Sequence, residues 1–133
     1  MHKIMALDVG TKRIGIALSD YLQVIATPLT TISRQPETEA IEKIVQIAKE
    51  NRVEKIVVGV PINMDGSEGF QAQDCTNFAQ KILGFDIIYE DERLTSEEAE
   101  ERLRSRRIDF RKNKGLVDME SASIILEQYL SRK

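Results

Sequence analysis

Short apolar runs mark the strands that this sequence predicts. Two of them, residues 3–8 and 13–19, follow each other closely and are joined by a tight turn through Gly10. A third segment, residues 24–31, is rich in β-branched residues, which favour extended backbone. Because only short connections separate these segments, we expect three antiparallel strands at the start of a sheet.

The rest of the chain alternates helical and extended patterns. Strands are predicted at residues 55–59 and from residue 86, the latter ending within residues 90–93. Helices are predicted after Pro36, from the loop at 61–69 to about Leu83, from Thr95 and from about Leu116. Thr95 and Glu98 have the spacing of a capping box at the start of the third helix.

The order of these elements predicts the fold class. The series βββαβαβα, with a further helix at the end, is typical of an α/β protein with a mixed five-stranded sheet flanked by helices. This is the order of the ribonuclease H-like fold. A chain of 133 residues has the length of a single domain, so one such domain is expected over residues 1–133.

Composition narrows the chemistry that is open to this domain. No apolar stretch approaches the ~20 residues of a membrane span, and residues 1–4 lack the pattern of a signal peptide, so a cytoplasmic protein is expected. The single cysteine, Cys75, shares an apolar helical spacing with Phe78 and Ile82 and is expected in the core. The only histidine is His2, so Ser-His-Asp catalysis, Cys-His catalysis and Cys/His zinc sites are poorly supported. Carboxylates, together with hydroxyls, must carry any chemistry.

Charge is unevenly distributed, although the net charge is only −3. Four glutamates between positions 97 and 101 precede a basic run, which comprises Arg102, Arg104, Arg106, Arg107, Arg111, Lys112 and Lys114. One interpretation is a helix whose acidic start and basic end suit its macrodipole. The other is a surface that contacts phosphates. The macrodipole accounts for Arg102 and Arg104, but less well for the residues beyond the predicted helix end.

Three acidic positions stand out, and each has an ordinary structural explanation beside a functional one. Asp8 ends the first predicted strand, where a carboxylate is costly unless a positive charge meets it, but it could also be a turn residue. Glu92 and its neighbour Asp91 follow the fifth strand and could instead form a solvated loop or pair with Arg93. Asp118 could be a first-turn helix charge, yet it lies one turn before Ala122 on the apolar stripe of the last helix.

These three positions can converge at one end of the predicted sheet. The first strand and the strand after the first helix would be neighbours, the fifth strand would lie beyond, and the last helix could bring Asp118 across. A cluster of carboxylates repels itself unless cations lie between its members. Mg²⁺ and Mn²⁺ accept oxygen-only ligands, and two such ions about 4 Å apart can promote phosphodiester hydrolysis. The pattern therefore favours a metal site, with Asp91 as an alternative to Glu92 among the ligands.

Four segments of the chain resemble one known family. They are residues 6–17 (ALDVGTKRIGIA), 58–69 (VGVPINMDGSEG), 91–96 (DERLTS) and 118–130 (DMESASIILEQYL). In this order they are similar to the YqgF family of bacterial ribonuclease H-like nucleases, also called the pre-16S rRNA nuclease or Holliday junction resolvase family. The sequence departs from the family pattern at Ser121, where alanine is common and where serine is also small.

The resemblance implies a site and a substrate class. It implies that Asp8, Glu92 and Asp118 are the catalytic acids and metal ligands of a cytoplasmic hydrolase that uses Mg²⁺ or Mn²⁺, with two ions expected. Its substrate would be the 5′ end of pre-16S rRNA or, alternatively, a four-way DNA junction, so the expected partner is structured RNA or branched DNA and no membrane.

Further residues receive hypothetical roles in substrate binding. Lys12 and Arg13 flank the turn after Asp8 and could hold a phosphate, although solvent exposure alone would explain them. Arg93 could stabilise the charged transition state or simply pair with a neighbouring acid. Asn63, in the loop 63–67, could line the substrate groove. The alternative is that this loop is an ordinary turn.

Other classes of function remain open from the sequence. Asp8-Val9-Gly10-Thr11 after a first strand also resembles the phosphate-binding hairpin of actin-like ATPases and sugar kinases, but those proteins close two domains around the nucleotide. A non-catalytic module that docks on RNA through residues 102–114 is a third possibility. Junction resolution needs paired cuts and predicts a dimer, whereas RNA trimming does not, so the oligomeric state stays open.

Overall fold

The first three strands form an antiparallel unit. The computed structural model describes residues 1–61, 69–92 and 95–132, and it begins with β1 (Lys3–Val9), β2 (Arg13–Ser19) and β3 (Ala26–Ser33). β3 starts and ends two residues later than the sequence predicts. The later start follows from Asp20, whose carboxylate accepts the N–H groups of Val24 and Ile25 at 2.8 and 3.0 Å and holds them in the loop.

The remaining elements follow the predicted order. They are α1 (Glu37–Glu50), β4 (Val53–Val60), α2 (Phe70–Ala79), β5 (Asp86–Asp91), α3 (Thr95–Ser105) and α4 (Gly115–Arg132). α2 ends earlier than predicted because Lys81 and Ile82 donate to the carbonyls three residues before them, which closes tight turns. The predicted capping box does not form: Thr95 is the first residue of α3 rather than its cap, and its hydroxyl donates to the carbonyl of Glu92 at 3.0 Å.

The five strands form one mixed sheet in the order β3-β2-β1-β4-β5. β1 is the central strand, antiparallel to β2 and parallel to β4, and β5 extends the parallel side. This arrangement agrees with the sheet predicted from the sequence. It brings the ends of β1, β4 and β5 to the same edge.

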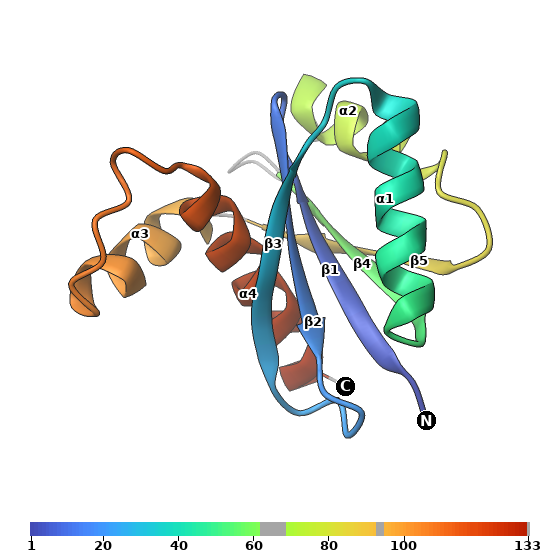
Figure 1. Cartoon of the computed structure of the whole chain (residues 1–133), viewed down its shortest axis with the longest axis horizontal. Coiled ribbons are helices and arrows are strands. Elements are labelled where there is room, and N and C mark those ends of the chain that lie inside the picture. Colours follow the sequence, from blue (N-terminus) through green and yellow to red (C-terminus); the bar gives the residue numbers. More distant parts are fainter. Residues whose placement is uncertain (62–68, 93–94, 133) are drawn as a thin grey trace.

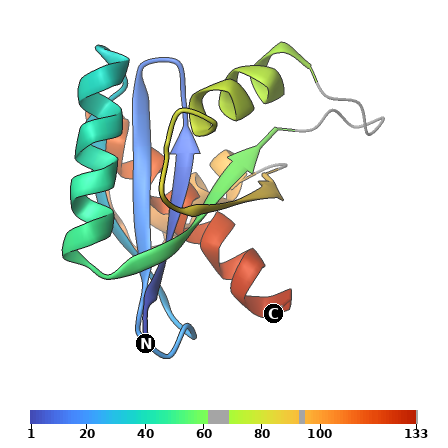
Figure 2. The same ribbon diagram turned by 90° about the vertical axis from the view of Figure 1, so that its right-hand side faces the viewer.

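Two apolar cores lie on opposite faces of this sheet (Figures 1 and 2). Met5, Leu7 and Val9 face α1 and α2, whereas Ile4 and Ala6 face α4, because successive side chains of a strand point to opposite sides. Continued alternation puts Asp8 on the α4 face, at the end of the row that Ile4 and Ala6 begin. In the part of the chain that the structure describes, no helix has the length and apolarity to cross a membrane.

α4 approaches the sheet closely at Gly15. A Cβ atom on this residue would lie 2.0 Å from the carbonyl oxygen of Asp118 and 2.9 Å from the amide nitrogen of Met119. Only glycine permits that approach, because the obstacle is helix backbone and not a movable side chain. Gly15 therefore decides where the first turn of α4, and with it Asp118, lies over β2.

Gly15→Ala should displace the first turn of α4. We expect a loss of about 2 kcal/mol or more of unfolding free energy in urea, because backbone must move to admit the methyl group. Gly115→Ala is the matched control, since its Cβ would meet only side-chain atoms of Asn113 and Thr31 at 3.1–3.3 Å. Equal stability of the two variants would contradict this account of the packing.

Candidate active site

Asp8 lies between two glycines of the neighbouring strands. Gly15 is its partner in β2, and in β4 the pairing of Leu7 with Val58 places Gly59 next to Asp8. A Cβ on Gly59 would come within 2.7 Å of the carboxylate oxygen Oε2 of Glu92. The missing side chains leave the space into which Glu92 and the first turn of α4 reach.

Glu92 meets Asp8 in this space. The residue directly follows β5, and its N–H donates to the carbonyl of Val60 at 3.2 Å, which extends the β4–β5 pairing. Its carboxyl group shares a hydrogen bond with the carboxyl group of Asp8. By contrast, the neighbouring Asp91 is exposed, so the geometry brings Glu92 rather than Asp91 to Asp8.

Loss of hydration governs the charge of this pair. It raises the pKa of Glu92 to about 9, and the negative charge of Asp8 acts in the same direction. Loss of hydration also raises the pKa of Asp8 to about 6, while the hydrogen bond from Glu92 opposes the rise and the charge of Asp118 adds to it. The pair therefore holds a proton at neutral pH, with Glu92 as the donor.

Asp118 lies near this pair but is bound elsewhere. Its Oδ2 accepts a hydrogen bond from Nε of Arg13 at 2.7 Å, and its side chain is 23% exposed. Within residues 1–61, 69–92 and 95–132, no three acidic, histidine or cysteine side chains are grouped as a ready set of metal ligands. The arrangement is thus a carboxyl pair with a third acid beside it, and Arg13 holds that acid.

The donor set suits a hard divalent cation. Carboxylate oxygens are the ligands that Mg²⁺ and Mn²⁺ prefer, and a cation between Asp8 and Glu92 would replace the proton that they share. Asp118 could join them if its carboxylate turned from Arg13. The described residues around the pair therefore fit the predicted metal, while the identity and number of ions remain predictions.

The structure also tests the remaining residues that the sequence singled out. Arg13 is occupied by Asp118, and Lys12 is exposed in the turn between β1 and β2. Asn63 and Arg93 lie outside the described residues. Cys75 is buried, as predicted for a core thiol, and burial raises its pKa to about 12.

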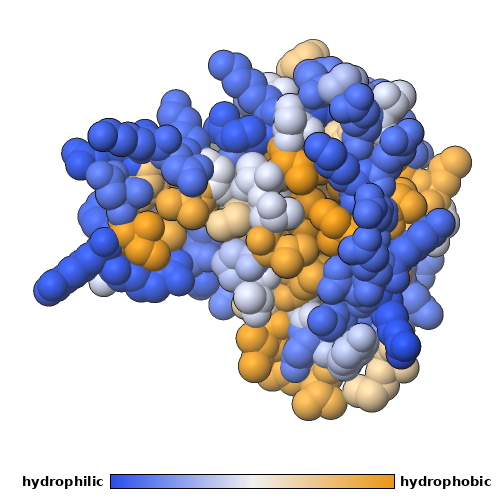
Figure 3. All heavy atoms as spheres, viewed as in Figure 1, coloured by the Kyte–Doolittle hydropathy of each residue, from blue (hydrophilic) through white to orange (hydrophobic). Residues whose placement is uncertain are grey.

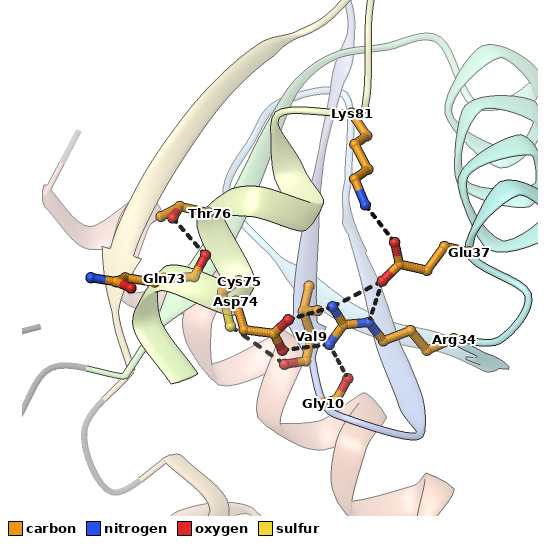
Figure 4. A network of polar contacts seen from close by, with 9 residues as sticks. All are labelled: Val9, Gly10, Arg34, Glu37, Gln73, Asp74, Cys75, Thr76 and Lys81. Atoms are coloured by element: carbon orange, nitrogen blue, oxygen red, sulfur yellow. Dashed lines mark hydrogen bonds and ion pairs between the residues drawn. The ribbon is translucent and has the colours of Figure 1, made fainter. Parts of the chain in front are cut away.

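An arginine that the sequence did not single out holds the turn after Asp8 (Figure 4). The Arg34 side chain is only 6% exposed and forms two hydrogen bonds with Asp74 of α2, at 2.6 and 2.7 Å. It also donates to the carbonyl of Gly10 at 3.0 Å and pairs with Glu37 at the start of α1. No periodic pattern marks such a residue, because its partners come from separate elements.

The family model described as RuvX, Holliday junction resolvase, matches residues 2–132. The chain belongs to this family. The resemblance predicted from the sequence is therefore confirmed.

Relatives of the RuvX-family chain carry a different functional name. A protein of Crocosphaera subtropica named "Putative pre-16S rRNA nuclease" is 46% identical, and the match covers 100% of this chain and 96% of the relative. A protein of the same name from Anaeromyxobacter sp. strain K is 40% identical, with 98% of each chain covered. Both the family name and these names describe nucleases.

Solved structures agree with the predicted fold. The fowlpox virus Holliday junction resolvase matches with a TM-score of 0.61 at 11% identity, over 98% of this chain and 99% of that one. Thermus thermophilus RuvC in complex with a Holliday junction matches with a TM-score of 0.56 at 12% identity, over 99% and 95%. The ribonuclease H-like fold is confirmed, and at such low identity the likeness extends to the fold alone.

The raised pKa values of Asp8 and Glu92 predict the pH dependence of stability in the metal-free protein. Between about pH 4 and pH 9, the folded state keeps protons that the unfolded chain has lost. The contribution of this pair to the free energy of unfolding should therefore fall as pH rises through that window. Urea denaturation of the wild type at several pH values, in the presence of a chelator, measures it.

A matched pair of variants identifies the source of the pH dependence. Glu92→Gln keeps a donor toward Asp8 but removes the group with the higher pKa, so the decline above about pH 6 should become shallower. Glu42→Gln, on the exposed side of α1, should leave the wild-type slope unchanged. A Glu92→Gln slope equal to that of the wild type would contradict the assignment.

Proposed function

We propose that this protein is a divalent-metal-dependent nuclease that hydrolyses phosphodiester bonds, with Asp8, Glu92 and Asp118 as its catalytic acids. The observation that supports this most strongly is the Asp8–Glu92 pair, two carboxyl groups in contact at the end of the central strand. Acids with strongly perturbed pKa values cluster at functional sites. Membership of a family named for a nuclease supports the same conclusion.

The chain's own residues prepare the site for a charged substrate. Asp8 and Glu92 would hold Mg²⁺ or Mn²⁺, two ions in our proposal, which supply an activated water and stabilise the leaving oxygen. Glu92 must lose its proton for this role. Asp118 must turn from Arg13, which then becomes available to a substrate phosphate beside the exposed Lys12.

The substrate that we propose is the 5′ end of pre-16S rRNA. Support comes from the relatives that bear the pre-16S rRNA nuclease name and match this chain over nearly their full length. A role in ribosome biogenesis follows, and with it a cytoplasmic location.

A four-way DNA junction is the second candidate substrate. The family description and the structural likeness to two junction resolvases favour it. Resolution of a junction requires two symmetric cuts, so this alternative also requires a dimer.

Loss of single carboxylates tests the catalytic assignment. Asp8→Asn, Glu92→Gln and Asp118→Asn should each lower metal-dependent cleavage by about 100-fold or more, because outer-shell partners of metals already cost 10–100-fold when removed. Cleavage rates under single-turnover conditions, with circular dichroism to verify folding, measure the effect. Asp91→Asn is the control, because Asp91 is exposed beside Glu92, and it should retain most of the activity.

Two outcomes would contradict the assignment. Equal cleavage by the wild type and Asp8→Asn would remove Asp8 from the site. Absence of cleavage by the wild type on every substrate, with nucleic-acid binding retained, would favour a non-catalytic RNA-binding module.

Competition between substrates tests the choice between RNA and DNA. Wild-type protein is incubated with Mn²⁺ or Mg²⁺ and with equal amounts of a pre-16S rRNA 5′ segment and a four-way DNA junction. We expect the RNA to be cut faster and the products to map to its 5′ region. Cleavage of the junction alone, in paired symmetric positions, would establish the alternative.

A further inference from the structure

An arm projects from the molecule beside the active-site edge of the sheet (Figure 1). It consists of the end of α3 and residues 106–114, which lead to α4. Basic residues dominate the arm, yet an apolar patch lies among its hydrophilic atoms (Figure 3). Ile108 is 38% exposed, and Phe110 is partly buried.

Phe110 borders two neighbouring cavities. One, of about 420 Å³, is also lined by Arg13 and Asp118 and therefore adjoins the candidate active site. The other, of about 500 Å³, lies further out and is also lined by Arg104 and Ile108. The guanidinium carbon of Arg104 lies 5.9 Å from the centre of the Phe110 ring. Phe110 thus forms an aromatic wall between the two cavities, with an arginine against it.

Basic side chains surround the inner cavity. Arg13, Arg111 and Lys114 line it, opposed by the acidic Glu100 and Asp118. Arg111 pairs with Asp109, whereas the exposed Lys114 has no ion pair with any residue of the described ranges. A third cavity, of about 520 Å³, continues past Arg13 along Thr31 and Lys112. Positive groups therefore follow a path from Asp118 outward, as a phosphate backbone requires.

We propose that Phe110 stacks on the base of an unpaired nucleotide next to the scissile phosphate, while Arg111 and Lys114 contact the adjoining phosphates. The inference rests on the proposed nuclease function and names its substrate class as a single-stranded or frayed strand. An aromatic ring beside a basic path is the usual combination in proteins that bind single strands. Paired bases within a duplex leave no face free for such a ring, whereas unpaired bases do.

Stacking of a base on Phe110 predicts no preference between ribose and deoxyribose. Every base has an aromatic face, so single-stranded RNA and DNA should both use the Phe110 wall. Discrimination between them must then come from contacts at the active-site edge. The binding experiment therefore uses both single-stranded RNA and single-stranded DNA.

The test measures binding in a chelator, which prevents cleavage. Single-stranded RNA and DNA oligonucleotides that carry 2-aminopurine, and duplexes of the same sequence, are titrated with wild-type protein and with Phe110→Ala. We expect quenching of the 2-aminopurine signal in the wild type, and in Phe110→Ala a loss of quenching with an affinity for single strands about tenfold weaker or more. Affinity for the duplexes should be the same for both proteins.

Two further variants separate stacking from folding. Phe110→Trp keeps an aromatic ring and should retain single-strand binding, even if Phe110→Ala is unstable. Tyr21→Ala is the matched control, because Tyr21 also carries a cation over its ring, at 4.9 Å from Lys3, in the loop between β2 and β3 at the opposite end of the sheet. This variant should bind like the wild type.

Each contrary outcome has a definite meaning. Wild-type affinity in Phe110→Ala, equal losses for single strands and duplexes, or failure of the wild type to quench would overturn the proposal. Cleavage is scored separately with Mg²⁺ or Mn²⁺. If the wild type cleaves but Phe110→Ala binds single strands normally, only the proposed stacking on Phe110 is wrong. If the wild type shows the expected stacking but does not cleave, only the proposed nuclease function is wrong.

Discussion

The contact between the carboxyl groups of Asp8 and Glu92 is the interaction on which the rest of the active-site edge depends. Two acids withdrawn from water repel each other once both are charged, so the edge is stable only with a shared proton or a cation. Room for the contact exists because glycines flank Asp8 on both neighbouring strands. Gly59 leaves space for Glu92, and Gly15 leaves space for the first turn of α4. The local packing therefore makes room for two acidic side chains, Asp8 and Glu92, that contribute nothing to the apolar cores of the fold.

Contacts on both faces of the sheet hold this edge in place. On one face, Arg34 joins α2, the start of α1 and the carbonyl of Gly10, directly after β1. On the other face, α4 is tied to β5 by the Glu90–Arg132 pair and to the end of α3 by the Glu120–Arg106 pair. Each pair has one buried partner, namely Arg34, Glu90 or Glu120, which would lose its counter-charge if the other partner were removed. Asp8 and Asp118 thus project from a strand and a helix whose ends are tied to neighbouring elements.

Arg13 connects the acidic site with the basic arm. It holds Asp118 and also lines two of the cavities that lead outward along the arm. A guanidinium can contact a carboxylate or a phosphate with the same geometry, so a substrate phosphate would compete with Asp118 for Arg13. In the proposed nuclease, arrival of a phosphate at Arg13 would free Asp118 for the metal. Catalytic acids and strand recognition would then be linked through one side chain.

The sequence by itself determined the order of the elements, the strand positions within about two residues, and the acids at the strand and helix ends, because local periodicity and turn chemistry record these features. It also indicated the family, which four spaced segments carry. It did not reveal that Arg34 pairs with Asp74, nor that Asp118 is held by Arg13. Nor did it show that Phe110 lines the cavity that contains Asp118. Each of these contacts joins residues that are far apart in the chain. They meet only in the tertiary structure, through the order of strands in the sheet and the close approach of α4 at Gly15.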